Sequence, residues 1–200
     1  MGDSDQLKIG IFGGGGVGKT CITIRYLKNE FTEGYIPTIE DEFSKIVEVD
    51  NKTVSLSIVD TAGQDDFAEM RFSYYKKVQG FVLVFDIGNP SSIDDLKQMY
   101  DDISNSIEGD TVHCVVAANK ADLRQEDRTD LVSVSEYANL ETEFKCKVVE
   151  TSARTGTNVK ELFETLIRQF ISPKKDKASS KTADKKEKDK SEEGGCCEIA

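Results

Sequence analysis

A glycine-rich segment near the start of the chain has the residue types that bind phosphate groups. Residues 11–21 are Ile-Phe-Gly-Gly-Gly-Gly-Val-Gly-Lys-Thr-Cys, in which Gly13, Gly18, Lys19 and Thr20 have the spacing G-x-x-x-x-G-K-T. In such a loop the backbone N–H groups turn inward around an anion, and the positive end of the following helix adds to the attraction. We expect Lys19 to reach the outer phosphates of a nucleotide and the Thr20 hydroxyl to bind Mg²⁺. A flexible linker is the alternative interpretation, but a linker would not have this fixed spacing between a strand-like and a helix-like segment.

A second segment, Ile-Val-Asp-Thr-Ala-Gly-Gln at residues 58–64, follows about forty residues later. In a phosphate-loop protein an aspartate at a strand end, here Asp60, belongs beside the magnesium ion. The backbone N–H of Gly63 can approach a terminal phosphate, and the neutral Gln64 side chain can orient an attacking water molecule. Thr38 lies in a polar, proline-containing segment, and its hydroxyl is the candidate that completes the magnesium shell when a third phosphate is present. An isolated D-x-x-G usually marks a turn. Here D-T-A-G-Q follows the phosphate loop by about forty residues, and this order favours a role in nucleotide hydrolysis.

The nucleotide base is indicated by Asn119, Lys120 and Asp122, which follow an apolar, strand-like run. The Asp122 carboxylate can accept two parallel hydrogen bonds from guanine, one from N1–H and one from the 2-amino group. Adenine has neither donor and would leave the buried charge unpaired, which gives strong discrimination. The N-K-x-D pattern alone is common at surface strand ends, and it gains weight from its order after Asp60. In the loop after the last predicted strand, the Ala153 backbone N–H is suited to the guanine carbonyl.

The spacing of apolar residues predicts the strands that must position these groups. Six apolar runs are expected to form strands, and helix-length segments separate most of them, which favours a mainly parallel sheet. The second and third strands are joined by residues 50–52, a connection short enough for one antiparallel hairpin. The predicted strands are residues 7–12, 43–49, 54–59, 81–85, 112–117 and 146–149.

Helices are predicted between most of these strands. The run after the phosphate loop, residues 17–28, is helix-like. Ser133 with Glu136 and Asn158 with Glu161 have the spacing of capping boxes at helix N-termini. Strands that alternate with helices predict a doubly wound α/β domain, with its ligand at the carboxyl ends of the strands.

Charge and composition divide the chain in two and limit its possible functions. The chain has 200 residues, 38% of them hydrophobic, and a formal net charge of −11. Residues 1–172 contain 18 Lys and Arg against 30 Asp and Glu, so this predicted domain is acidic and poorly suited to nucleic acid. Residues 173–200 contain 8 Lys, 7 acidic residues and no aromatic residue, which predicts a disordered, Lys-rich tail. No apolar run approaches the roughly 18 residues that would span a bilayer.

Over the predicted domain the sequence resembles the Ras superfamily of small GTPases, and within it the Ras and Rap branch. The superfamily motifs are the phosphate loop, D-T-A-G-Q, N-K-A-D and E-T-S-A-R. The branch is indicated by Y-I-P-T-I-E-D-E-F at residues 35–43 and Q-D-D-F-A-E-M at residues 64–70. Val59 stands where Rab and Rho proteins usually have Trp, and no long inserted helix lies between Asp122 and Ser152. The sequence departs from the usual pattern at Ile36, Glu42, Phe67 and Arg154.

The resemblance implies a small G domain of the phosphate-loop NTPase class, with about five helices on both faces of a six-stranded sheet. It implies an enzyme that binds GTP and GDP with Mg²⁺, hydrolyses GTP to GDP and phosphate, and signals to effectors in the GTP state. The implied metal ligands are Thr20, Thr38 and Asp60, and the implied catalytic residues are Gln64, Lys19, Thr38 and Gly63. The implied nucleotide-binding residues are Gly13, Gly15, Gly16, Val17, Gly18, Lys19, Thr20, Cys21, Phe31, Tyr35, Thr38, Gly63, Asn119, Lys120, Asp122, Ser152, Ala153 and Arg154.

The resemblance also implies a monomer with protein partners, namely an exchange factor, a GTPase-activating protein and effectors. The missing side chain of Gly15 leaves room for an arginine from the activating protein. An effector with a basic surface can add a strand beside the acidic residues that precede the second predicted strand, although a solvated acidic edge is the alternative. The implied effector-binding residues are Tyr35, Ile39, Glu40, Asp41, Glu42 and Phe43.

Two other functions stay open on the sequence. A phosphate-loop kinase or metabolic NTPase would need an arginine-rich lid and an acceptor site, and no such lid is recognisable. A GTP-bound scaffold with little hydrolysis would be expected to lose Gln64 or to fill Gly15, and both residues are intact.

The last four residues, Cys197-Glu198-Ile199-Ala200, fit a C-a-a-X lipidation motif whose final Ala is typical of farnesylation. Geranylgeranylation of Cys196 and Cys197 is the alternative lipid interpretation. A cysteine that stands at this position by chance, with no lipid attached, is the remaining alternative. One lipid chain binds membranes only marginally, and Cys196 and the eight tail lysines are candidates for the second signal. We therefore expect the protein on the cytoplasmic face of a membrane, with the plasma membrane as the expected one.

Overall fold

The computed structural model describes residues 6–33, 40–63, 68–107 and 111–172, and these form one six-stranded sheet with helices on both faces. The strand order is β2-β3-β1-β4-β5-β6, in which β2 and β3 are antiparallel and every other neighbouring pair is parallel. The predicted sheet is therefore confirmed. The strands are β1 (Gln6–Phe12), β2 (Glu40–Val49), β3 (Lys52–Thr61), β4 (Gly80–Asp86), β5 (Cys114–Asn119) and β6 (Lys147–Glu150).

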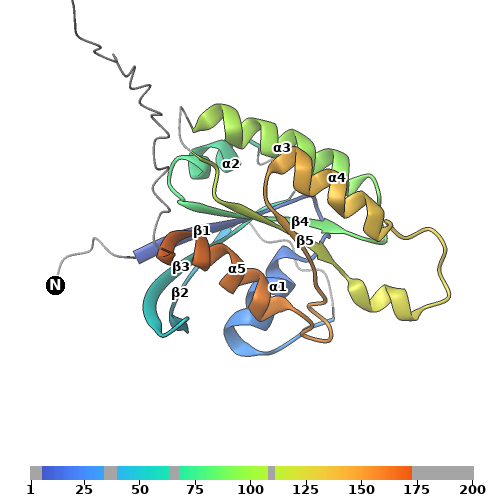
Figure 1. Cartoon of the computed structure of the whole chain (residues 1–200), viewed down its shortest axis with the longest axis horizontal. Helices are drawn as coiled ribbons and strands as arrows, with labels where there is room; N and C mark the ends of the chain where they lie inside the picture. The colour runs from blue at the N-terminus through green and yellow to red at the C-terminus, as the bar shows by residue number, and fades with distance from the viewer. Residues whose placement is uncertain (1–5, 34–39, 64–67, 108–110, 173–200) are drawn as a thin grey trace, which may run out of the picture.

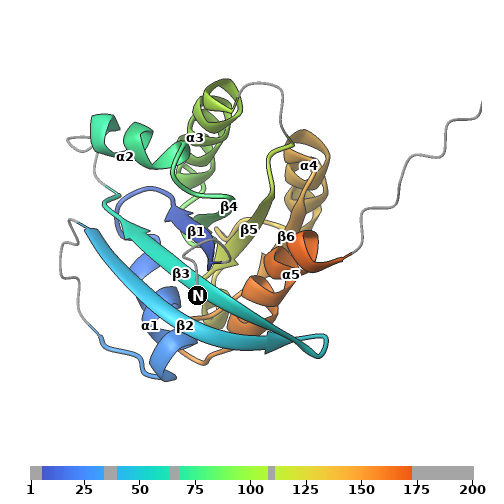
Figure 2. The same ribbon diagram turned by 90° about the vertical axis from the view of Figure 1, so that its left-hand side faces the viewer.

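In the described ranges, five α-helices cover the two faces of the sheet. Figures 1 and 2 show α2, α3 and α4 on one face and α1 and α5 on the other. A short 3-10 helix, η2 (Ala121–Gln125), follows β5. None of the helices in the described ranges is long and apolar enough to cross a membrane. The α-helices are α1 (Lys19–Lys28), α2 (Ala68–Tyr75), α3 (Ser92–Ser106), α4 (Val134–Phe144) and α5 (Val159–Ile171).

Strand β4 shows how the sheet is buried on both sides. Its side chains alternate between two apolar clusters: Val82 and Val84 pack toward α1 and α5, whereas Phe81, Leu83 and Phe85 pack toward α3 and α4. All five side chains are fully buried. A strand in the middle of a parallel sheet contacts helices on both faces, which is why its sequence is continuously apolar rather than alternating.

The β2–β3 hairpin is longer than the apolar pattern predicted. The ladder runs from Glu40 opposite Thr61 to Val49 opposite Lys52, so β2 begins three residues before the predicted start. The cause is that ladder hydrogen bonds need only backbone groups, and polar side chains on an edge strand can point to solvent. The turn itself contains two residues, both in the left-handed region, which is the geometry that joins twisted antiparallel strands.

The capping box predicted at Ser133 and Glu136 is present, whereas the prediction of one at Asn158 and Glu161 is wrong. Glu136 accepts a hydrogen bond from the Ser133 backbone N–H at 2.9 Å, and Ser133 caps α4 in return. Asn158 precedes α5 but has φ 54° and makes no side-chain cap. Its amide group instead donates to the Glu150 backbone oxygen at 2.8 Å, so the last loop is tied to the end of β6.

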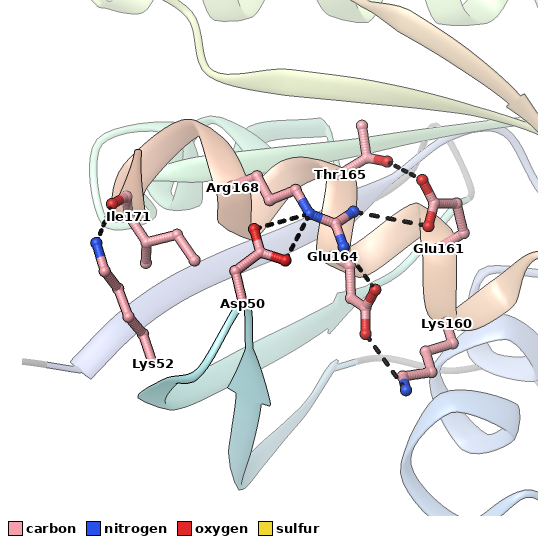
Figure 3. Close-up of polar contacts among 8 residues, drawn as sticks. All are labelled: Asp50, Lys52, Lys160, Glu161, Glu164, Thr165, Arg168 and Ile171. Carbon is pink, nitrogen blue, oxygen red and sulfur yellow. Dashed lines mark hydrogen bonds and ion pairs between the residues drawn. The ribbon is translucent and has the colours of Figure 1, made fainter. Parts of the chain in front are cut away.

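Helix α5 is attached to the hairpin turn by the polar contacts in Figure 3. Arg168 Nε lies 3.1 Å from Asp50 Oδ2, and Arg168 Nη2 lies 3.0 Å from Glu164 Oε2. Lys52 Nζ donates to the Ile171 carbonyl at 2.6 Å and satisfies one of the free acceptors at the end of the helix. The Asp50 side chain is 55% exposed and that of Arg168 is 35% exposed, so their ion pair is worth at most about 1 kcal/mol.

Packing of α5 on α1 depends on Phe163. Its side chain is fully buried and stacks on the Tyr26 ring at a centroid distance of 3.9 Å. We expect Phe163→Ala to lower the free energy of unfolding by about 3 to 5 kcal/mol, because the lost ring leaves a cavity between two helices. Urea unfolding of the GDP-loaded protein measures this. The control Val134→Ala removes a side chain that is 63% exposed, and it should change stability by less than about 0.5 kcal/mol. A loss below about 1 kcal/mol for Phe163→Ala would contradict the packing argument.

Candidate functional site

A pocket of about 510 Å³ lies where β1, β3, β5 and β6 end. Its walls come from the glycine-rich loop, the start of α1, the segment before β2, and the loops after β3, β5 and β6. This is the carboxyl edge of the parallel strands, where the sequence predicted the ligand. The lining residues are Gly15, Gly16, Gly18, Lys19, Thr20, Cys21, Ile24, Glu30, Phe31, Thr32, Glu33, Thr61, Gly63, Asn119, Lys120, Asp122, Leu123, Ala153 and Arg154.

The glycine-rich loop wraps around the Lys19 ammonium group. Lys19 Nζ donates to the Gly13 and Gly14 carbonyl oxygens, each at 2.9 Å, and the side chain is 6% exposed. Gly63 lies against the same group, and a Cβ on Gly63 would collide with Lys19 Nζ and with the Gly14 backbone. The loop after β3 and the glycine-rich loop are therefore in contact, which requires glycine at position 63.

Asp60 supplies a buried negative charge beside Thr20. Its carboxylate is fully buried, and within the described residues neither oxygen has a hydrogen-bond partner of good geometry. Burial raises the pKa of Asp60 to about 6, although the nearby Thr20 hydroxyl and Lys19 ammonium lower it. A carboxylate with free lone pairs next to a hydroxyl is a donor set suited to Mg²⁺, which prefers oxygen ligands. The described residues contain no cluster of three or more His, Cys, Asp or Glu that could hold a metal alone. Phosphate and water oxygens would have to complete the shell.

Asn119 connects the glycine-rich loop to the loops after β5 and β6. Its Nδ2 donates to the Val17 carbonyl at 2.8 Å, and its Oδ1 accepts from Thr151 Oγ1 at 3.4 Å. The same oxygen accepts from the Ala153 backbone N–H at 3.3 Å, the group that the sequence assigned to the guanine carbonyl. Gly18 has φ 99°, and a Cβ there would collide with Asn119 Nδ2. This amide therefore fixes the relative position of both ends of the pocket.

Asp122 lines the pocket and is held by residues of the loop after β6. The Ser152 hydroxyl donates to Asp122 Oδ1 at 2.6 Å, and Arg154 Nη1 lies 3.9 Å from Asp122 Oδ2. Lys120 is paired with Asp86 at 2.7 Å. The Asp122 side chain remains 15% exposed toward the pocket, so its remaining lone pairs can accept further hydrogen bonds.

The family model that describes the Ras family matches residues 8–172, the whole unit that carries these loops. The chain belongs to the Ras family. Ras-like protein rasB of Dictyostelium discoideum is 36% identical over 199 residues, a match that covers 100% of both chains. The Ras-family chain is thus a small GTPase that hydrolyses GTP, and the predicted resemblance, fold and enzyme class are confirmed.

Most of the predicted nucleotide-binding residues of this Ras-family protein line the pocket. Three of them, Gly13, Val17 and Ser152, do not line it and instead bind residues that do. Gly13 and Val17 contribute backbone carbonyls that accept from Lys19 and Asn119, and Ser152 binds Asp122 rather than lining the pocket. The predicted residues Tyr35, Thr38, Ile39 and Gln64 lie outside the described residues, and the side chain of Glu40 is also not described.

Two residues that the sequence did not indicate, Arg25 and Glu33, bind the loop after β6 where it lines the Ras-family pocket. Arg25 Nε donates to the Ala153 carbonyl at 2.7 Å, and Arg25 Nη2 donates to the Arg154 carbonyl at 2.6 Å. The Arg25 guanidinium also lies 6.0 Å from the Phe31 ring centroid. Glu33 pairs with Arg154 at 2.6 Å. The sequence gives no signal for these contacts, because a charged residue on a helix or in a loop is ordinarily solvated.

We expect Asp122→Asn to weaken GDP binding by about 3 kcal/mol or more, roughly a hundredfold in Kd, because the amide cannot accept both guanine hydrogen bonds. Affinity for xanthosine diphosphate should rise relative to GDP, since its 2-oxo group accepts from the amide. Competition against a fluorescent nucleotide measures both. Asp127→Asn changes an exposed acid of the same segment and is the matched control. Equal GDP affinity in Asp122→Asn and the parent would show that Asp122 does not contact the base.

Proposed function

We propose that this Ras-family GTPase is a Mg²⁺-dependent, membrane-attached switch that binds effectors in its GTP state. The observation that carries the proposal is the fully buried Asp60 carboxylate, whose oxygens have no hydrogen-bond partner of good geometry in the described residues. It lies beside Thr20, which lines the pocket together with Lys19 and Gly63. Mg²⁺ bound there would neutralise charge on the phosphates. Thr20 and Asp60 would hold the ion, with Thr38 as a third ligand in the GTP state.

In the proposed hydrolysis of GTP, the residues around the γ-phosphate have different roles. Lys19 donates hydrogen bonds to phosphate oxygens, the Gly63 N–H binds the γ-phosphate, and Gln64 orients the attacking water molecule. When the γ-phosphate leaves, Thr38 and Gly63 lose the group that held their loops, so loop order reports the nucleotide state. Among the described residues, a Cβ on Gly15 would meet only the Gly63 carbonyl, at 3.9 Å, which supports an open approach for an arginine from an activating protein.

The edge of the sheet supports the proposed effector surface. β2 is the first strand in the sheet order, so one side of its backbone lacks a strand neighbour in the described residues. Asp41 and Glu42 are exposed on it. A hydrogen bond from Ser57 and an ion pair with Lys8 lower the pKa of Glu42, so this carboxylate stays charged. A partner with basic side chains could pair with this strand and its acids.

The switch proposal is tested by affinity capture with the protein loaded in turn with GDP and with a non-hydrolysable GTP analogue. Proteins captured only with the analogue are effectors of the proposed kind. Removal of Mg²⁺ with a chelator should speed nucleotide release in either state. A capture pattern that does not depend on the nucleotide would contradict the switch.

We expect Gln64→Leu to keep nucleotide binding but to slow GTP hydrolysis stimulated by an activating protein by about 10²- to 10³-fold, because only water positioning is removed. The ratio of bound GTP to GDP, measured by chromatography of the extracted nucleotide, should rise accordingly. Gln98→Leu on the exposed side of α3 is the matched control and should leave the ratio unchanged. Normal stimulated hydrolysis in Gln64→Leu would refute this role.

Membrane attachment is proposed from the tail, which lies outside the described residues. The C-a-a-X pattern at Cys197 provides one lipid, and Cys196 with the eight tail lysines provides the second signal that stable binding needs. Lysines near an anionic surface contribute up to about 1 kcal/mol each, and the interspersed acids reduce this. The acidic domain would be repelled by the same surface, so the attraction must come from the tail.

We expect Cys197→Ser to move the protein wholly into the cytosolic fraction, because the prenyl group can no longer be attached. Cys196→Ser should keep the prenyl group but weaken or redirect membrane attachment. Fractionation and intact-mass analysis of the cellular protein measure both outcomes. Persistence of Cys197→Ser in the membrane pellet would overturn the proposed attachment.

A further inference from the structure

Three side chains next to the base end of the pocket form a closed set of hydrogen bonds. Arg124 Nε donates to Glu150 Oε1 at 2.9 Å, and Arg124 Nη2 donates to the Tyr137 hydroxyl oxygen at 2.7 Å. The Tyr137 hydroxyl donates to Glu150 Oε2 at 2.9 Å. Arg124 belongs to η2, Tyr137 to α4 and Glu150 to the end of β6. We call this set the Arg124 triad.

The Arg124 triad connects the same two segments that meet at Asp122. Arg124 is two residues after Asp122, and Glu150 is two residues before Ser152. The Asp122–Ser152 hydrogen bond of 2.6 Å and the Arg124–Glu150 ion pair therefore join the segments at two neighbouring points. A backbone hydrogen bond from the Ala121 N–H to the Thr151 carbonyl at 3.0 Å joins the same two segments next to these contacts.

The surroundings of the triad make it more rigid than a surface ion pair. The side chains of Arg124 and Glu150 are each 29% exposed, and Tyr137 is 8% exposed. Burial and the hydrogen bond to Glu150 raise the pKa of Tyr137 to about 12, so the hydroxyl stays protonated and can donate. Arg124 Nη2 also donates to the Val132 carbonyl at 2.9 Å, which attaches η2 to the segment before α4.

We propose that Arg124, with Tyr137 and Glu150, is a positioning residue for base recognition that holds Asp122 in the orientation that accepts both guanine hydrogen bonds. The inference rests on the proposed role of Asp122 in binding the base. Two parallel hydrogen bonds require the carboxylate plane to match the guanine edge, and small displacements weaken both. Without Arg124, the polar contacts of η2 with the β6 side that remain in the described residues are the Asp122–Ser152 hydrogen bond, the Arg154–Asp122 ion pair and the Ala121–Thr151 backbone hydrogen bond. The carboxylate would then be oriented less firmly.

The test compares GDP with inosine diphosphate, whose base has N1–H but no 2-amino group. The ratio of the two dissociation constants measures the two-bond geometry at Asp122, whereas a general loss of stability weakens both nucleotides alike. We expect Arg124→Ala to lower this preference for GDP by about fivefold and to speed GDP release by up to about tenfold. Arg124→Lys, which keeps the charge opposite Glu150, should restore part of the preference.

The matched control is Arg128→Ala, because Arg128 pairs with Asp130 at 2.6 Å within its own loop and does not join the two segments. Its preference for GDP should equal that of the parent. Tyr137→Phe keeps the ring and removes only the hydroxyl, so it tests the triad if Arg124→Ala does not fold, and it should lower the preference in the same direction.

The outcomes separate the inference from the base-recognition role on which it rests. If the parent itself shows no preference for GDP over inosine diphosphate, Asp122 does not contact the 2-amino group. The base-recognition role of Asp122 and the positioning role of Arg124 then both fail. If the parent prefers GDP and the Arg124 and Tyr137 variants keep that preference, base recognition stands and the positioning role is overturned, even when GDP release is faster.

Discussion

Parallel pairing of β1, β3, β4, β5 and β6 forces the loops that follow these strands to one edge of the sheet. Segments that are far apart in the chain then share one pocket: the glycine-rich loop, the loop at Gly63, the loop at Asn119 and the loop at Ala153. The pairing persists because helices cover both faces of the sheet and the central strand β4 is apolar and fully buried from Phe81 to Phe85. The contacts among these four loops depend on this arrangement of the strands.

The phosphate end of the pocket contains two buried charged groups, the Lys19 ammonium and the Asp60 carboxylate. Lys19 is surrounded by loop carbonyls, and the fully buried Asp60 has a pKa raised to about 6 by burial. Burial of the Asp60 carboxylate is costly in isolation, and a divalent cation beside it would compensate that charge. The same balance explains why nucleotide binding and protein stability are expected to be linked, since a ligand that binds only the folded state stabilises it.

The base end is held by side-chain hydrogen bonds between segments rather than by regular structure. Asn119 joins the glycine-rich loop to the loop after β6, Arg25 adds bonds to the carbonyls of that loop, and the Arg124 triad joins η2 to β6. Fixed side chains around the pocket reduce the ordering cost of binding. The two ends are therefore coupled through the Asn119 amide, which contacts both.

The sequence by itself determined the α/β class with its one antiparallel hairpin, and most of the pocket residues. Glycine spacing, D-T-A-G and N-K-x-D are contiguous patterns whose chemistry is local, so they could be read without the fold. The sequence did not determine the start of β2, since backbone ladders also accept polar residues, or the role of Asn158, whose amide bonds β6 instead of capping α5. The contacts of Arg25 with Ala153 and of Arg124 with Glu150 were decided only by the tertiary structure. The physical reason is that these partners lie far apart in the chain, and an arginine carries no local sign of which distant acceptor the fold will bring to it.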